Sequence, residues 1–242
     1  MLTPTNIEYG QFNWQIYKGC LHKPMGVCPV TNCWSEAMSK RQGWDFHRPE
    51  LLTKNLLDPL KKKKPTRILV NFSGDLFGDW VDPNTPIHID GLLGYDKLRD
   101  GVDAVVANNW RHTFIFLTKA PENIWKIDWP DNCWMGASVW DTRSFVAATY
   151  TLQKIRAKHK WLSLEPFLKA IPIHSSITWL RDGGISFVVI GAEDHPLKLP
   201  RKEWVTEIES ACIEANIPYW EKNNLKTLFD RPLHQEYPNW RD

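Results

Sequence analysis

Short apolar segments alternate along this chain with longer segments in which apolar residues recur every three or four positions. Short runs rich in β-branched and aromatic residues are typical of strands, and near-continuous apolar runs indicate strands that are buried on both faces. The pattern therefore predicts strands at residues 12–17, 67–72, 113–117, 134–139, 161–164, 186–190 and 217–220.

Segments with helical spacing lie between these strands, at residues 35–42, 89–108, 142–158 and 203–215. In the third of them, Phe145, Ala148 and Leu152 fall on one face of a helix. Strands that alternate with helices imply βα units and a parallel sheet. We expect an α/β fold in which a full or partial parallel (β/α) barrel forms one domain over residues 1–242, with 224–242 as a packed C-terminal tail.

Polar side chains follow the predicted strands at their carboxyl ends, where parallel α/β folds collect their functional groups. Since these ends meet at one edge of a sheet, the residues there predict a polar ligand-binding cavity. They are Ser73, Gly74, Asp75, Thr118, Lys119, Ser138, Trp140, Asp141, Arg143, Glu165, Glu193, Asp194, Glu221 and Lys222.

Among these strand-end residues, we predict that Lys119, Glu165 and Glu193 are the catalytic groups. Asp75, Asp141 and Asp194 also suit helix N-caps, because an aspartate oxygen accepts hydrogen bonds from the first N–H groups of a helix. Glu165 and Lys119 could instead form a structural ion pair. Each of these residues could therefore have a structural role instead of a functional one.

The composition is that of a globular chain, with 43% hydrophobic residues, 24% charged residues and a formal net charge of +2. This near balance of charge does not indicate a particular class of binding partner, and it argues against strong nonspecific binding to nucleic-acid phosphates. Met1–Gly10 is polar, and no stretch approaches the length of a membrane span. We expect a soluble cytoplasmic protein without a membrane partner, in a compartment where thiols stay reduced.

Three of the five cysteines lie close together, and seven residues separate Cys20 from Cys28 while four separate Cys28 from Cys33. Three thiolates on one loop can ligate three irons of a [4Fe–4S] cluster and leave the fourth iron open. Structural zinc instead needs four ligands, and His22 or His47 could complete a Cys3His site. The cysteine spacing alone leaves both centres possible.

Further segments carry a resemblance that runs nearly end to end. With the cysteine motif, their order and spacing resemble the phage- and prophage-associated three-cysteine proteins of unassigned function, which are related to the radical S-adenosylmethionine (SAM) superfamily. The usual radical SAM spacing is C-x3-C-x2-C, so this chain needs a longer cysteine loop. The matching segments are ILVNFSGDLFGDWV at 68–81, FIFLTKAPEN at 114–123, WMGASVWDTR at 134–143, WLSLEPFL at 161–168, FVVIGAED at 187–194 and QEYP at 235–238.

This resemblance implies a barrel of the radical SAM type, with a [4Fe–4S] cluster on the three cysteines and SAM bound at the open iron. Ser73 and Asp75 match positions where the superfamily contacts the methionyl amine. Ser138, Arg143 and Glu165 match positions where polar groups meet the ribose or the carboxylate.

The implied function is a radical SAM-like iron–sulfur enzyme that takes an electron from an external donor and cleaves SAM to a 5′-deoxyadenosyl radical. Phage association points to a nucleic-acid base or nucleotide as substrate, as in DNA modification or repair, in the cytoplasm of the host cell. The 14 tryptophans could stack on bases, although aromatic residues also fill cores. The alternative is a non-catalytic nucleic-acid-binding protein stabilised by zinc or a cluster.

Overall fold

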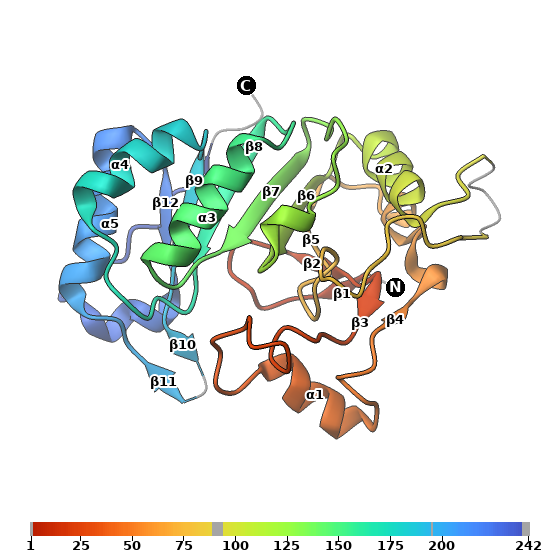
Figure 1. Cartoon of the computed structure of the whole chain (residues 1–242), viewed down its shortest axis with the longest axis horizontal. Coiled ribbons are helices and arrows are strands. Elements are labelled where there is room, and N and C mark those ends of the chain that lie inside the picture. The colour runs from red at the N-terminus through yellow and green to blue at the C-terminus, as the bar shows by residue number, and fades with distance from the viewer. Residues whose placement is uncertain (1, 89–93, 195, 239–242) are drawn as a thin grey trace. The chain divides into compact units, whose positions relative to one another are not determined.

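The computed structural model describes residues 2–88, 94–194 and 196–238. It has a mixed α/β fold with a large, mostly parallel central sheet of eight strands, in the order β1-β2-β5-β6-β7-β8-β9-β12 (Figure 1). The chain forms two compact units. The first unit comprises Met1–Cys28, Trp34–Met135 and Arg156–Lys158, and the second comprises Pro29–Cys33, Gly136–Ile155 and His159–Asp242. The expectation of one domain over the whole chain stays a prediction.

The first unit contains the amino-terminal strands of the sheet. β1 (Thr3–Pro4) pairs antiparallel with β2 (Phe12–Trp14), whereas β2, β5 (Arg67–Val70) and β6 (Thr113–Thr118) are parallel neighbours. The residues at the centre of β5 and β6 are almost fully buried, as their apolar runs predict. The unit also holds the antiparallel pair β3 (Tyr17–Lys18) and β4 (Glu50–Leu51), the helices α1 (Trp34–Gln42) and α2 (Leu98–Asn108), and 3₁₀ turns at Thr53–Asn55, Asp58–Lys61 and Pro121–Asn123.

The second unit contains three parallel strands, β8 (His159–Leu164), β9 (Phe187–Ile190) and β12 (Tyr219–Glu221). Its helices are α3 (Thr142–Gln153), α4 (Ile173–Asp182) and α5 (Lys202–Ala215), of which α4 packs against both others. An antiparallel hairpin of β10 (Glu193–Asp194) and β11 (Leu197–Lys198) follows β9, and a 3₁₀ turn at Asn223–Leu228 follows β12. β7 (Cys133–Ser138) crosses the boundary between the units in sequence.

The start of α3 confirms one of the three predicted N-caps, Asp141, whereas Asp194 lies in β10. The Asp141 carboxylate accepts a hydrogen bond from Ser144 N, and the Ser144 hydroxyl binds the backbone of Asp141 in return, which is a capping box. From this cap, Phe145, Ala148 and Leu152 follow on one buried face, as the helical spacing predicts. Asp75 caps no helix in the described part of the chain and binds a different set of donors, described below.

The sheet does not close within the residues that the structure describes, so of the two expected forms the full barrel is wrong, while a partial barrel of the radical SAM type stays a prediction. The reason lies at its β12 edge, where one side of β12 pairs with β9 and the other side is occupied by the C-terminal tail. Glu221 N donates to His234 O, and Glu236 N donates to Tyr219 O. Because the tail takes these backbone groups, no further strand of the sheet can pair there.

The element boundaries differ from the predictions mainly at helices. The predicted helix 89–108 begins only at Leu98, and residues 89–93 of that prediction lie outside the described residues. The predicted helix 142–158 ends at Gln153. The first predicted strand, 12–17, divides into β2 and β3, which belong to different sheets.

In the described ranges, no helix combines the length and the apolar composition needed to cross a lipid bilayer.

Candidate metal centre

The loop that carries Cys20 and Cys28 folds back on itself in the first unit. Gly19 adopts a left-handed backbone conformation, with φ at 86°, and forms a bridge to Gly74 just beyond β5. After this turn, Val27 N and Cys28 N both donate to the carbonyl oxygen of His22, at 2.8 and 3.1 Å. The chain therefore returns to His22 before it reaches Cys28, which keeps both cysteines in one short loop.

The Asp75 carboxylate fastens this loop to the carboxyl ends of β5 and β6. Its Oδ2 accepts hydrogen bonds from His22 Nε2 at 2.7 Å, Thr118 Oγ1 at 2.9 Å and Lys119 N at 2.9 Å. Its Oδ1 accepts one from Phe77 N at 2.9 Å. Four donors match the acceptor capacity of a carboxylate, so a ligand amine would have to displace one of them to reach Asp75.

The His22 ring is held at one nitrogen and has no partner at the other. His22 is 2% exposed, and its Nδ1 is a buried atom without a hydrogen-bond partner in the described structure. The ring also packs edge-on against Trp80, with 4.9 Å between ring centroids. A histidine that binds a metal commonly donates its second ring N–H to a carboxylate, which is the relation that His22 Nε2 has with Asp75.

The Cys20 thiol lies in surroundings that favour its neutral form. Burial raises the pKa of Cys20 to about 12, and the charge of Asp75 adds to this, whereas the backbone N–H of His22 lowers it. Metals bind the thiolate, so a cation at this position would displace the thiol proton. Cys20, Cys28 and Cys33 are all free and half-buried.

Thiols, an unpartnered imidazole nitrogen and an orienting carboxylate fit a cysteine-bound metal by their donor chemistry. Cys20 and Cys28 belong to the first unit, and Cys33 belongs to a segment of the second unit, Pro29–Cys33. Within residues 2–88, 94–194 and 196–238, no three histidine, cysteine or acidic side chains form a group that could hold a metal ion.

The other predicted residues divide between the two units. Ser73 and Lys119 join Asp75 in the first unit; Ser73 Oγ accepts a hydrogen bond from Asn13 Nδ2 at 3.3 Å, and Lys119 contacts Asp75 through its backbone N–H. In the second unit, Ser138 is buried at the end of β7 and Arg143 is exposed in the first turn of α3. Their roles toward SAM stay predictions.

Glu165 and Glu193, also in the second unit, are both engaged by lysines. Glu165 pairs with Lys222, a residue that follows β12 and that the sequence had placed among the strand-end groups without a role. Glu193 is 5% exposed and pairs with Lys198 across the β10–β11 hairpin at 3.0 Å. Neither Lys222 nor His22 is among the predicted catalytic or SAM-binding residues. Their signals in the sequence are the position of Lys222 after a predicted strand and the position of His22 beside Cys20.

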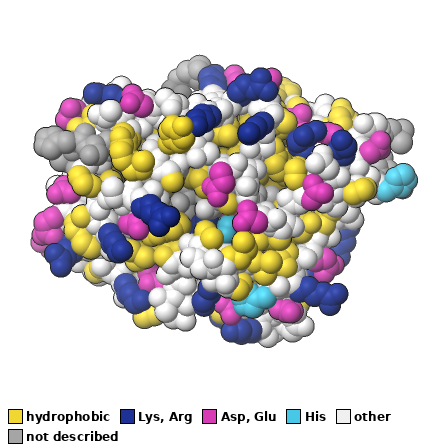
Figure 2. Space-filling view, in the orientation of Figure 1, with side chains coloured by type: hydrophobic (Ala, Val, Ile, Leu, Met, Phe, Trp, Pro, Cys, Tyr) yellow, Lys and Arg dark blue, Asp and Glu magenta, His cyan; other side chains and the backbone are white. Residues whose placement is uncertain are grey.

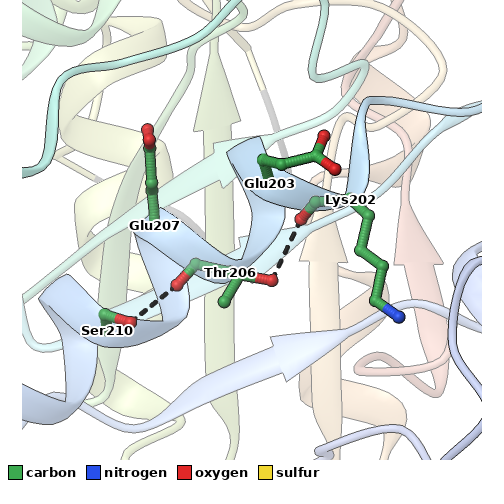
Figure 3. Close-up of a pocket in the computed structure, with 5 residues that line it drawn as sticks. All are labelled: Lys202, Glu203, Thr206, Glu207 and Ser210. Atoms are coloured by element: carbon green, nitrogen blue, oxygen red, sulfur yellow. Dashed lines mark hydrogen bonds between the residues drawn. The ribbon is translucent and has the colours of Figure 1, made fainter.

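A hollow on the surface of α5 contains none of the predicted site residues. It is lined by Lys202, Glu203, Thr206, Glu207 and Ser210, all on one helix (Figure 3). The Thr206 hydroxyl donates to Lys202 O and the Ser210 hydroxyl donates to Thr206 O, so both are satisfied by the helix backbone.

Comparison with known proteins identifies the family of the chain. Neither the curated proteins nor the solved structures contain a match. A family model described as a protein of unknown function, DUF5131, matches residues 4–227, which is nearly the whole chain. The chain belongs to the DUF5131 family.

Proposed function

We propose that this protein is an iron–sulfur enzyme of the radical SAM type, in which Cys20, Cys28 and Cys33 hold a [4Fe–4S] cluster. The observation that carries the proposal is the buried bond from His22 Nε2 to Asp75, because it fixes the cysteine loop at the carboxyl ends of β5 and β6. Parallel α/β proteins place their reactive groups at these strand ends.

The resemblance to three-cysteine, phage-associated proteins related to the radical SAM superfamily supplies the reaction class. When bound, a reduced cluster of this kind provides the electron that cleaves SAM to methionine and a 5′-deoxyadenosyl radical, with an external one-electron donor as the source. The residues of this chain would position SAM. Ser73 lies directly before the Gly74–Asp75 turn, and Ser138 ends β7. We propose a nucleic-acid base or nucleotide as the substrate.

A zinc-stabilised protein that binds nucleic acid without catalysis is the second candidate. The buried and unpartnered Nδ1 of His22 favours it, because one imidazole nitrogen and three cysteine thiolates make up the donor set of a Cys3His zinc site. On the face shown in Figure 2, however, lysine and arginine side chains are interspersed with acidic ones and form no continuous cationic patch. Strong binding to phosphates depends on such patches.

Anaerobic purification followed by an absorption spectrum and metal analysis separates the two candidates. The iron–sulfur proposal expects about four iron atoms per chain and broad visible absorption. Substitution of Cys20, Cys28 or Cys33 by alanine should abolish the colour, whereas the matched control Cys212→Ala should keep it, because Cys212 is fully buried in the second unit. One zinc per chain without colour would overturn the proposal.

The reaction itself is tested on the coloured protein. With dithionite and SAM, the proposal expects 5′-deoxyadenosine and methionine in equal amounts, detected by chromatography. An intact cluster that yields neither product would refute radical chemistry while leaving the metal centre in place. If the protein is instead a zinc-stabilised nucleic-acid-binding protein, its affinity for DNA should not depend on SAM and should fall steeply with added salt.

A further inference from the structure

A buried carboxylate of the second unit holds the spacer between Cys28 and Cys33. The backbone N–H of Thr31 donates to Glu193 Oε1 at 2.7 Å, across 162 residues of sequence. Glu193 lies in β10 and is 5% exposed. A hydrogen bond to a charged carboxylate is among the stronger bonds in proteins, so this contact restricts the spacer.

Lys198 contacts both Glu193 and Thr31. Its Nζ donates to Glu193 Oε2 at 3.0 Å and to Thr31 Oγ1 at 3.1 Å, from the position directly opposite Glu193 in the β10–β11 hairpin. Burial alone would raise the pKa of Glu193, but the Thr31 N–H and the Lys198 ammonium hold it below its ordinary value. The carboxylate is therefore charged when it binds the spacer. We call these three residues the spacer clamp.

The clamp acts where this sequence departs from the usual radical SAM motif. Four residues separate Cys28 from Cys33, instead of two, and Thr31 is one of these four. Cys33 follows Thr31 by two residues and immediately precedes α1. Both oxygens of Glu193 are used in the clamp, which suits a positioning group better than an acid–base catalyst.

We propose that Glu193 is a positioning residue that fixes the spacer and, through it, the third cysteine thiol for metal binding. The inference rests on the proposed function only in the last step, the binding of the metal. A longer spacer can adopt more conformations, so Cys33 keeps one position only if the spacer is held. The clamp provides this restraint.

The first test measures the thiols of the metal-free protein and needs no activity. Rates of iodoacetamide alkylation at Cys20, Cys28 and Cys33 are followed separately by peptide mass spectrometry. In Glu193→Ala, Cys33 should react about 10- to 100-fold faster, as expected from the loss of a charge-assisted hydrogen bond, while Cys20 and Cys28 keep their rates. Glu193→Gln should fall between, because its amide oxygen can still accept from Thr31.

Two further variants complete this test. Lys198→Met removes the ammonium but leaves the buried carboxylate, so it provides a milder disruption if Glu193→Ala fails to fold. Glu203→Gln is the matched control, since Glu203 is exposed in the first turn of α5. Unchanged rates at Cys33 in both clamp variants would overturn the proposal. Equal acceleration at all three cysteines would also overturn it, because that result indicates general loosening.

The second test is metal retention. Glu193→Ala should bind the reconstituted metal about 10- to 100-fold more weakly than the unaltered chain, as for other residues that orient ligands from outside the coordination shell. Equal retention by both would overturn the positioning role. If the unaltered chain binds no metal but Cys33 still accelerates selectively, the proposed function fails while the clamp stands.

Discussion

His22 and Asp75 form a hydrogen bond of 2.7 Å between side chains that are only 3% and 4% exposed. The two residues lie 53 positions apart in sequence, so the bond joins the cysteine loop to the end of β5. A carboxylate in this position must be satisfied by its donors, because a buried charge without partners is unstable.

We predict that Asp75→Asn lowers the free energy of unfolding by about 2–4 kcal/mol, because three donors on Oδ2 lose a charged acceptor. Urea unfolding followed by tryptophan fluorescence measures this change. Asp96 is exposed, so the control Asp96→Asn should change the free energy of unfolding by less than about 0.5 kcal/mol. A similar small change in Asp75→Asn would contradict the structural role of the network.

A pair of buried glutamates in the second unit makes stability depend on pH. Arg231 binds both Glu209, at 2.6 Å, and Glu221, at 2.8 Å. Burial and the neighbouring Glu221 raise the pKa of Glu209 from 4.5 to about 7. Since the folded protein then holds this proton more tightly than the unfolded one, the contribution of Glu209 to stability falls as pH rises from about 4.5 to about 7.

Glu209→Gln should therefore flatten the pH dependence of stability. Between about pH 5 and pH 8, the free energy of unfolding of the unaltered chain should fall by on the order of 1–3 kcal/mol more than that of the variant. Urea midpoints at several pH values give both slopes. Parallel slopes would show that Glu209 titrates at an ordinary pKa in the folded protein.

The Glu165–Lys222 ion pair should contribute more than an exposed pair. Its side chains are 21% and 11% exposed, whereas those of Arg156 and Asp128 are 67% and 79% exposed. A double-mutant cycle with Glu165→Gln and Lys222→Met should give a coupling energy of about 1–2 kcal/mol. The matched cycle at Arg156 and Asp128 should give less than about 1 kcal/mol. Equal couplings would exclude a special contribution from burial.

Gly136 leaves room for the indole of Trp161 in the core of the second unit. A Cβ atom at position 136 would lie 2.2 Å from Trp161 Nε1, which is far inside contact distance. Gly136→Ala should therefore cost about 1–3 kcal/mol of unfolding free energy through overpacking. Adding Trp161→Ala removes the clashing atoms, so the double variant should be more stable than the sum of the single effects predicts. Strict additivity would contradict the clash.

The strands were the most predictable part of this fold. β5, β6 and β9 are buried apolar runs, and such runs mark strands with little dependence on distant contacts. α4 was missed, although Ser176 and Leu180 fall on one buried face. Its serines, threonine and β-branched residues have low helix propensity, so packing against α3 and α5 decides its conformation.

The contacts around the candidate site could not be predicted in the same way. Position after a strand correctly singled out Asp75 and Glu165 as polar groups at strand ends, because this depends on topology alone. The partners of these residues come from far along the chain, as with Lys222 and Glu165, 57 positions apart. Hydrophobic periodicity holds no information about such pairings, and one carboxylate can bind any suitable donor that the fold brings near.

The tail that runs along β12 has a consequence for solubility. Exposed edge strands offer unpaired backbone groups as templates for other chains, and natural sheets protect them. Here His234 and Glu236 take the backbone groups of β12, and the His234 ring stacks on Tyr219 at 4.1 Å. A chain cut after Pro232 would leave Glu221 N and Tyr219 O without these partners at the edge of the sheet, so we expect it to self-associate more readily through β12.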